Sequence, residues 1–313
     1  MDFAQLAENF LQALVAGLLT GAVYGLMCVG LSLIFGVMRV INFAQGDFMM
    51  LGMYAALYIF AHLTGVAAPY LAALVAGPVV FVVGVVVHRL LIARVTGLRS
   101  TVLDSEGHHA QLMLTLGIAL ILQNGGLALF GSSPVSIPTP LASSAWELGP
   151  MAGDRLSVFV NQGQTIAAAI ALVTVGVFVL LLARSRLGKS LRAAADNPVA
   201  AIYMGIDVER AHRLAFGLGV AITAVGGGLL ASVYPFQPYI GLEYVIVMYA
   251  GVVLGGLGSV AGAFLGGLGI GIVQQLSTLV LPNQLQNTAI FVVFLAVILL
   301  RPQGLFGRAV RRT

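Results

Sequence analysis

The sequence predicts an all-α, polytopic transmembrane bundle of eight to ten spans, with one short helical loop that lies in water. Of its 313 residues, 59% are hydrophobic and 8% are charged, whereas a soluble domain carries about 25% charged residues. Apolar runs recur along the whole chain, and a helix of about 20 apolar residues crosses the hydrocarbon core. No polar stretch is long enough for a soluble domain. Residues 1–313 are therefore expected to form a single membrane domain.

Nine apolar segments are candidate spans. They cover residues 10–37, 41–62, 69–94, 110–130, 163–184, 212–234, 243–258, 260–281 and 286–300. The division of 10–62 and of 243–281 stays open, because glycine and polar residues interrupt both segments and can mark helix breaks inside the membrane. Eight to ten spans is the resulting range.

The basic residues predict the orientation. Nine spans with an external N-terminus put 14 of the 15 basic residues on one side. Those residues are Arg39, Arg89, Arg94, Arg99, Arg184, Arg186, Lys189, Arg192, Arg210, Arg213, Arg301, Arg308, Arg311 and Arg312, with Arg155 opposite. Basic residues are enriched in cytoplasmic loops. Loop 185–211 and the C-terminus are therefore expected in the cytosol and loop 131–162 outside, with Trp146 and Tyr70 at membrane interfaces.

The net charge of +4 does not indicate a nucleic-acid partner, because the basic residues lie beside apolar spans and not in one stripe. The surrounding lipid is the expected environment. Cys28 is the single cysteine, so no intrachain disulfide can form.

The most polar segment is RSRLGKSLRAAADNPVAAIYMGIDVERAHR, which runs from Arg184 to Arg213 between two apolar runs. Its alanine-rich first half favours a helix. Asn197 and Pro198 are typical of an N-cap and a first helical residue, and Gly205 suits the position just past a helix end. The pattern predicts a rigid two-part element that serves as a docking surface. An ordinary structured loop is the alternative.

Glycines recur every four residues in two places, which leaves one helix face without side chains and lets neighbouring backbones approach closely. The residues concerned are Gly17, Gly21 and Gly25, and Gly258, Gly262 and Gly266. Tight packing within one subunit is the favoured interpretation, and an interface with a partner subunit is the alternative.

Polar residues inside the apolar runs are few, and the densest group is Asn42, Gln45, Gly46 and Asp47. Asn42 and Gln45 are three apart and are expected to share a helix face. An ionisable residue in a span suggests a function, so the group is a candidate for the pathway or a gate. A structural ion pair between Asp47 and Arg39 is the alternative.

Further polar residues lie toward the predicted external ends of spans. Gln123 and Asn124 are candidates for an outer vestibule, as are Gln274, Gln275 and Glu243. The alternative is that these side chains simply meet water.

No catalytic, nucleotide or metal site is expected. LGKS ends like a phosphate-binding loop, but its first glycine would be residue 183, which is Ala183. The five histidines show no metal-ligand spacing, and no serine lies in a nucleophile elbow.

Three segments carry a resemblance to a known family. They are GAVYGLMCVGLSLIFGVMRVINFAQGDFMMLGMYAAL, MGIDVERAHRLAFGLGVAITAVGGGLLA and GVVLGGLGSVAGAFLGGLGIGIVQQL. In this order the chain resembles permeases of branched-chain amino-acid ABC transporters, of the LivH type. The resemblance implies a related second permease of the LivM type, two cytosolic ATP-binding subunits that hold ATP and Mg, and a periplasmic or extracellular amino-acid-binding protein. It also implies a bacterial inner (plasma) membrane location and no cofactor in this chain.

The resemblance assigns the coupling to the ATPases to the segment from Arg192 to Gly205. The residues assigned are Arg192, Ala193, Ala194, Asp196, Asn197, Pro198 and Gly205. The family's N-F-A-x-G-D block falls on Asn42, Phe43, Ala44, Gly46 and Asp47.

Two departures from the family pattern stand out. The importer coupling signature places a glutamate before two alanines, where this chain has Arg192, so the docking register is open. Gln45 stands where relatives often carry histidine, which argues against a proton relay.

The expected function is that of a non-catalytic permease subunit in an ATP-driven importer of branched-chain or other hydrophobic amino acids. The alternative is a stand-alone secondary transporter or channel for small polar solutes. Such a protein would need an ion-coupling acid near the membrane midplane and repeated halves. Asp47 alone approaches the first requirement, and no repeat is visible.

Overall fold

Helices dominate the computed structural model, which describes residues 3–96, 105–151, 156–282, 285–301 and 304–305. The first half of the chain forms α1 (Phe3–Met38), α2 (Gln45–Phe60), α3 (Ala68–Val87), the π-helix η1 (His88–Ile92), α4 (Ala93–Thr96) and α5 (Ser105–Phe130). The second half forms α6 (Gln162–Arg184), α7 (Arg186–Asp196), α8 (Pro198–Tyr203), α9 (Val208–Ala231), α10 (Ile240–Gly255), α11 (Val260–Ser277) and α12 (Gln286–Leu300). The prediction of a helical membrane bundle is confirmed.

Six helical segments of the described chain are long and apolar enough to cross a membrane. They lie in α1, α3 with its extension to Val95, α5, α6, α9 and α11. The other predicted spans are helical too, but α2 and α10 have 16 residues and α12 has 15. These three fall short of the about 20 residues of a full span. The predicted count of eight to ten is therefore not confirmed.

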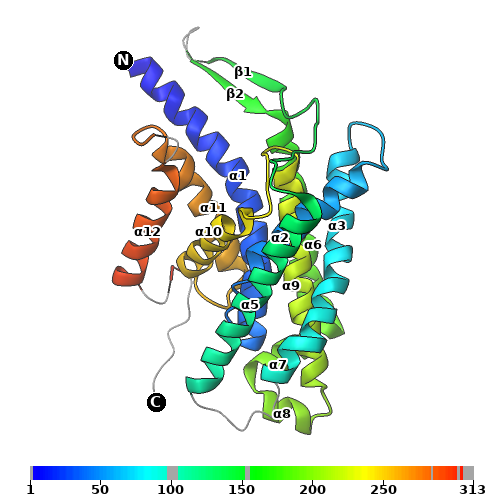
Figure 1. The fold of residues 1–313 in the computed structure, drawn as a ribbon. Coiled ribbons are helices and arrows are strands. Elements are labelled where there is room, and N and C mark those ends of the chain that lie inside the picture. Colours follow the sequence, from blue (N-terminus) through cyan, green and yellow to red (C-terminus); the bar gives the residue numbers. More distant parts are fainter. Residues whose placement is uncertain (1–2, 97–104, 152–155, 283–284, 302–303, 306–313) are drawn as a thin grey trace.

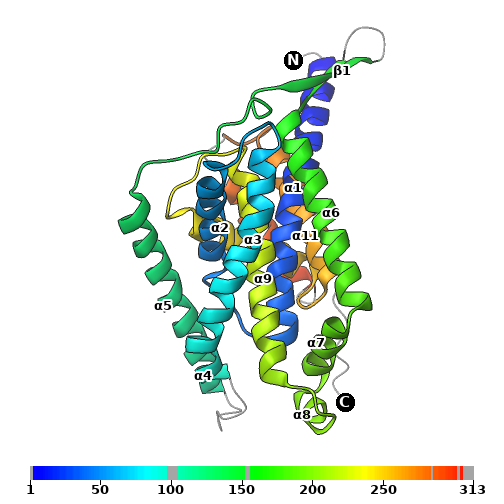
Figure 2. The same cartoon turned by 90° about the vertical axis from the view of Figure 1, so that its right-hand side faces the viewer.

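The helices form a central pair with a surrounding layer. In the apolar windows of α1 and α9, 83% and 89% of the residues are buried, against 22% in α5 and 28% in α6. Figure 2 shows α5 and α6 at opposite edges of the bundle, and Figure 1 shows α12 at a further edge, on the side of α11. Large apolar side chains are exposed on α5 and α6, among them Leu120 and Ile121 on α5 and Val173 and Val177 on α6, as contact with lipid favours.

Glycines bring α1, α11 and α10 together. Gly17, Gly21 and Gly25 of α1 lie against α11, and a Cβ on Gly21 would lie 2.6 Å from the carbonyl oxygen of Leu268. We call this contact the glycine seam. On another face of α11, Gly262 and Gly266 lie equally close to the backbone of α10. The three helices can approach this closely because the glycines lack side chains.

Gly258 does not share the helix face of Gly262 and Gly266, so that prediction is wrong. It lies before the start of α11 at Val260, in the turn that follows α10. Its φ is +84°, and that of Gly256 is +101°. Only glycine adopts such angles without strain, so these residues allow the sharp reversal between α10 and α11.

Loop 131–162 contains a β-hairpin, which the all-α prediction missed. Strand β1 (Ala145–Met151) pairs antiparallel with β2 (Leu156–Asn161). The alternating, β-branched residues of LSVFVN favour a strand, but the apolar run of α6 that follows hid the pattern. The hairpin is tied to the start of α1, because Gln12 Nε2 donates to the carbonyl of Phe159 at 2.6 Å.

The two ends of the bundle differ in charge. The last turns of α1, α3 and α6 and the start of α9 lie at the same end as α7 and α8, opposite the hairpin (Figures 1 and 2). The described basic residues flank these helix ends and the end of α12. Arg99, Arg155, Arg308, Arg311 and Arg312, which entered the orientation argument, lie outside the described residues.

Tyr70 is not an interfacial residue, since only 4% of it is exposed. Its hydroxyl donates to the carbonyl of Gly163 at 3.5 Å. Trp146 on β1 is 48% exposed.

Candidate functional site

The chain between α1 and α2 is a buried break between two helices. Residues 39–44 are not helical, and α2 begins at Gln45. Asn42 Nδ2 donates to Gln45 Oε1 at 2.9 Å, and Gln45 Nε2 donates to Thr223 Oγ1 of α9 at 2.6 Å. All three side chains are fully buried. Asn42 and Gln45 do not share a helix face, because Asn42 precedes the helix, but their side chains satisfy one another and fix the break against α9.

Asp47 lies in the first turn of α2, where a negative charge is favourable. Its side chain is 1% exposed, and among the described residues its Oδ1 has no hydrogen-bond partner. Gly46 and Asp47 pack directly on Gly241 in the first turn of α10. Asp47 therefore lies where the N-terminal turns of two helices meet.

The predicted alternative for Asp47, an ion pair with Arg39, is absent. Arg39 is exposed and ends α1 with a φ of +54°. The polar side chain that reaches the Asp47 carboxyl is Gln123 of α5.

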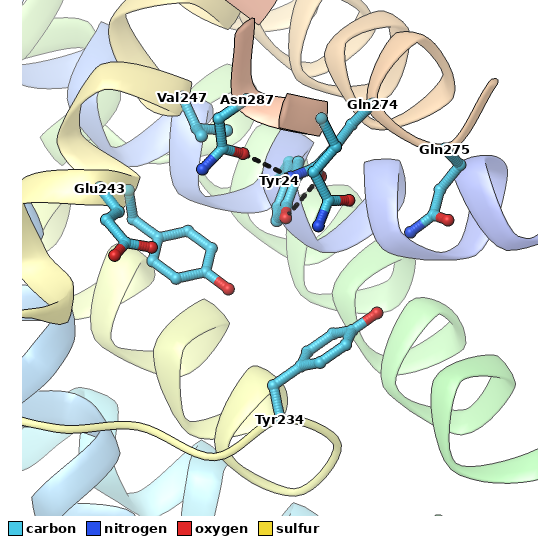
Figure 3. Close-up of a pocket in the computed structure, with 9 residues that line it drawn as sticks. Tyr24, Tyr234, Glu243, Val247, Gln274, Gln275 and Asn287 are labelled. Atoms are coloured by element: carbon cyan, nitrogen blue, oxygen red, sulfur yellow. Dashed lines mark hydrogen bonds between the residues drawn. The ribbon is translucent and has the colours of Figure 1, made fainter. Parts of the chain in front are cut away.

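A cavity of about 170 Å³ opens between α1, α10, α11 and α12, and we call it the tyrosine vestibule (Figure 3). It is lined by Tyr24, Tyr234, Glu243, Tyr244, Val247, Gln274, Gln275, Gln286 and Asn287. Gln274, Gln275 and Glu243 were candidates for such a vestibule, and they line one cavity. Gln123 and Asn124 belong elsewhere, since Gln123 faces Asp47 and Asn124 Nδ2 donates to Leu120 on its own helix.

Hydrogen bonds hold one wall of the vestibule. Tyr24 Oη donates to Gln274 Oε1 at 2.9 Å, and Gln274 Nε2 donates to Asn287 Oδ1 at 3.0 Å. The rings of Tyr24 and Tyr244 meet edge to face at 5.9 Å. Sequence reasoning missed the tyrosines. An amphipathic ring inside an apolar run was the available signal.

At the opposite end of the bundle, α7 and α8 are held by caps. Asn197 Oδ1 accepts from the N–H of Ala200 at 3.0 Å, and Pro198 begins α8. Gly205 follows α8 with a φ of +79°. Asp207 caps α9 by accepting from the N–H of Arg210 at 2.9 Å. The predicted N-cap at Asn197, the first helical residue Pro198 and the glycine just past the helix end are therefore all present.

The coupling residues taken from the resemblance do not all face outward. Ala194 is fully buried on the inner face of α7. Arg192 is exposed, but its Nη1 donates to the carbonyl of Leu182 at the end of α6, at 2.7 Å. Asp196 and Asn197 are exposed.

Apolar side chains gather at the exposed end of α8, and we call them the docking tip. They are Val199 and Ile202, 53% and 44% exposed, and Tyr203 and Met204, 85% and 81% exposed. Sequence reasoning missed them as contact residues, although their apolar character in a charged loop was visible.

Among the described residues, no group of three or more histidine, cysteine, aspartate or glutamate side chains could hold a metal ion. The apolar helices, the buried break and the vestibule together define a multi-pass membrane protein of the transport class.

The chain belongs to the family described as "Branched-chain amino acid transport system / permease component", whose model matches residues 13–300. It is 29% identical over 309 residues to the high-affinity branched-chain amino acid transport system permease protein LivH of Escherichia coli K12, covering 96% of both chains. It is 30% identical over 308 residues to BraD of Pseudomonas aeruginosa, again covering 96% of both chains. The probable LivH of Methanocaldococcus jannaschii is 30% identical over 90% of this chain and 88% of its own. No solved structure matches the chain.

Proposed function

We propose that this chain is the permease subunit of an ATP-driven importer of branched-chain amino acids. The family match across residues 13–300 carries the proposal. Relatives that cover 96% of the chain are named as permeases of high-affinity branched-chain amino acid transport systems. The assembly would contain a related second permease, two cytosolic subunits that bind ATP and Mg, and an external amino-acid-binding protein.

The proposed topology has eight to ten membrane segments in the inner (plasma) membrane, with α7, α8 and the C-terminus in the cytosol. Among the described residues, the six long apolar helices, the shorter apolar helices α10 and α12, and the basic residues at the α7–α8 end support it. The β-hairpin and the tyrosine vestibule would then face the exterior, where the binding protein delivers its cargo.

The docking tip is the surface proposed to contact the ATP-binding subunits. Large apolar side chains exposed to water mark protein interaction sites, and the tip lies within the most charged segment of the chain. The caps at Asn197 and Gly205 restrict α8 to one orientation. Helix α7 packs on α8, α1, α6 and α9. A force applied to the tip would therefore move α7, because no flexible loop lies between the two helices.

The route from the tip to the vestibule runs through α1. Helix α1 packs on α7 at one end and carries the glycine seam with α11 along its length. Helices without intervening side chains move together because their backbones are in contact. Closure of the ATPases would thereby be transmitted to the helices that line the vestibule.

Reconstituted vesicles test the function. Uptake of radiolabelled leucine is expected only when ATP, the ATP-binding subunits and the binding protein are all present. Uptake by this chain alone, driven by an ion gradient, would instead support the secondary-transporter alternative.

The docking tip has its own test. Replacing Tyr203 and Met204 with alanine removes the two most exposed side chains of the tip, and truncation of an interface anchor costs about 2 kcal/mol or more. Retention of the ATP-binding subunits on the purified permease is expected to weaken by about tenfold or more. Tyr58→Ala, an exposed tyrosine of α2 outside the loop, is the control. Unchanged retention in the double variant would place the ATPase contact elsewhere.

A further inference from the structure

The tyrosine vestibule has an uneven charge. Among its lining residues, Glu243 is the only charged side chain, and no lysine, arginine or histidine accompanies it. The remaining polar groups are tyrosine hydroxyls and side-chain amides. Figure 3 shows Glu243 and Tyr234 on the same side of the cavity, across from Gln275, and Tyr244, the next residue after Glu243 on α10, also lines it.

Such a wall suits a small organic cation better than an anion. A carboxylate attracts an ammonium group directly, and aromatic faces add a favourable cation–π interaction when a cation comes within about 6 Å of the ring. The cavity of about 170 Å³ is smaller than the roughly 300–1,000 Å³ of typical drug-sized sites. It therefore fits a ligand of few heavy atoms, such as the head of an amino acid.

We infer that the tyrosine vestibule is a binding site for primary ammonium groups, and that Glu243 is the residue that receives the charge. The inference rests on the proposed function, because it names the part of the amino acid that this chain would hold. A wall with a carboxylate and no cation attracts the α-ammonium and repels the α-carboxylate. The α-carboxylate would then be held by groups outside the lining of the vestibule.

Glu243 does not belong to the hydrogen-bonded wall of the vestibule. Two hydrogen bonds join the row from Tyr24 through Gln274 to Asn287 and fix these side chains in place. Glu243 is exposed and makes no ion pair within the part of the chain that the structure describes, so its charge remains available to a ligand. Glu243 also lies in the first turn of α10, where the helix N-terminus favours a negative charge.

A charge-sensing cysteine tests the inference without ATP or the binding protein. Gln275 lines the vestibule. The single native cysteine, Cys28, is fully buried, so labelling of the protein without the new cysteine gives the background rate. In membrane vesicles that contain the full assembly, Gln275→Cys is labelled with a cationic and an anionic methanethiosulfonate reagent. The ratio of the two rates reports the local charge, because any change in thiol ionisation affects both rates equally.

Adding Glu243→Gln is expected to lower the ratio of cationic to anionic labelling by about two- to tenfold, as the loss of one nearby charge predicts. Glu243→Asp is expected to retain the ratio. Glu147→Gln, which removes an exposed charge from the hairpin, is the matched control and should leave it unchanged. Ser133→Cys in the exposed loop reports whether Glu243→Gln acts only locally.

Ligand protection completes the test. The amine 3-methylbutylamine is leucine without its carboxylate, and 4-methylpentanoate is leucine without its amine. The amine is expected to slow labelling of Gln275→Cys, and the acid is not. Equal protection by both compounds, or an unchanged rate ratio in Glu243→Gln, would overturn the inference. Failure of ATP-dependent uptake would instead count against the proposed function, since labelling needs no transport.

Discussion

The glycine seam between α1 and α11 predicts a large effect from one methyl group. In Gly21→Ala the new Cβ would lie 2.6 Å from the carbonyl oxygen of Leu268 and 3.0 Å from its Cα, whereas ordinary contact begins at 3.4 Å. Both atoms belong to the backbone, so no side chain can rotate away. The helices must separate by roughly 0.5–1 Å, which forfeits a quarter to a half of each dispersion contact along the seam. Overpacking of this kind costs about 1–3 kcal/mol.

The matched control is Gly176→Ala in the middle of α6, where a Cβ would meet nothing within 4 Å. Both substitutions gain the same helix propensity of about 1 kcal/mol, so their difference isolates the packing cost. We expect Gly21→Ala to be about 1–3 kcal/mol less stable than Gly176→Ala, measured by SDS-induced unfolding followed by circular dichroism. Equal stability of the two variants would refute the conclusion that α1 and α11 are held in backbone contact.

Three further substitutions test the buried break and the caps. Gln45→Leu removes the acceptor of the Asn42 amide and the donor to Thr223, and the expected loss of unfolding free energy in the same assay is about 0.6–1.7 kcal/mol for the interhelical bond to Thr223. Retained stability would show that the break is fixed by packing alone. Asn197→Ala removes the cap of α8 and is expected to cost about 1 kcal/mol locally, visible as faster hydrogen exchange of residues 198–204, whereas Asn197→Asp should exchange as the native chain does. Gly205→Ala forces a side chain into a φ of +79° at about 1–2 kcal/mol, and unaltered exchange there would show that the turn relaxes.

The sequence could predict those parts of the fold that depend on neighbouring residues. The cap at Asn197, the positive φ of Gly205 and the long apolar helices depend on residues within a few positions of one another, and the sequence displays these directly. The β-hairpin was equally local, but six strand residues before a 23-residue apolar helix give a weak signal. The predicted span 41–62 was longer than α2, because hydropathy does not show where the chain leaves the helix. The predicted spans 243–258 and 286–300 already had the lengths of α10 and α12, 16 and 15 residues, and were counted as spans although both are shorter than the membrane core requires.

The site depended on contacts that spacing cannot show. Gln274 and Gln275 were predicted candidates, but Tyr24 lies 250 positions from Gln274, and only the packing of α1 on α11 brings them together. Gln123 and Asn124 are adjacent in sequence yet point in different directions, one toward Asp47 and one along its own helix. For the same reason the ion pair of Arg39 and Asp47 failed, because residues 39–44 leave the helix and carry Asp47 away from the exposed arginine.

The contact of Asp47 with α10 connects the buried break between α1 and α2 to the helix that lines the vestibule. Its unpaired oxygen lies beside Gly241, and a Cβ there would come within 2.5 Å of Oδ1 and 2.8 Å of the Gly46 carbonyl carbon. The carboxyl thus lies at the N-terminal turns of both α2 and α10, where the two helix dipoles favour a negative charge. Glu243 is only two residues further along α10. Any displacement of α10 by a ligand at Glu243 must therefore move Gly241 against α2, because there is no side chain or space between them to absorb it.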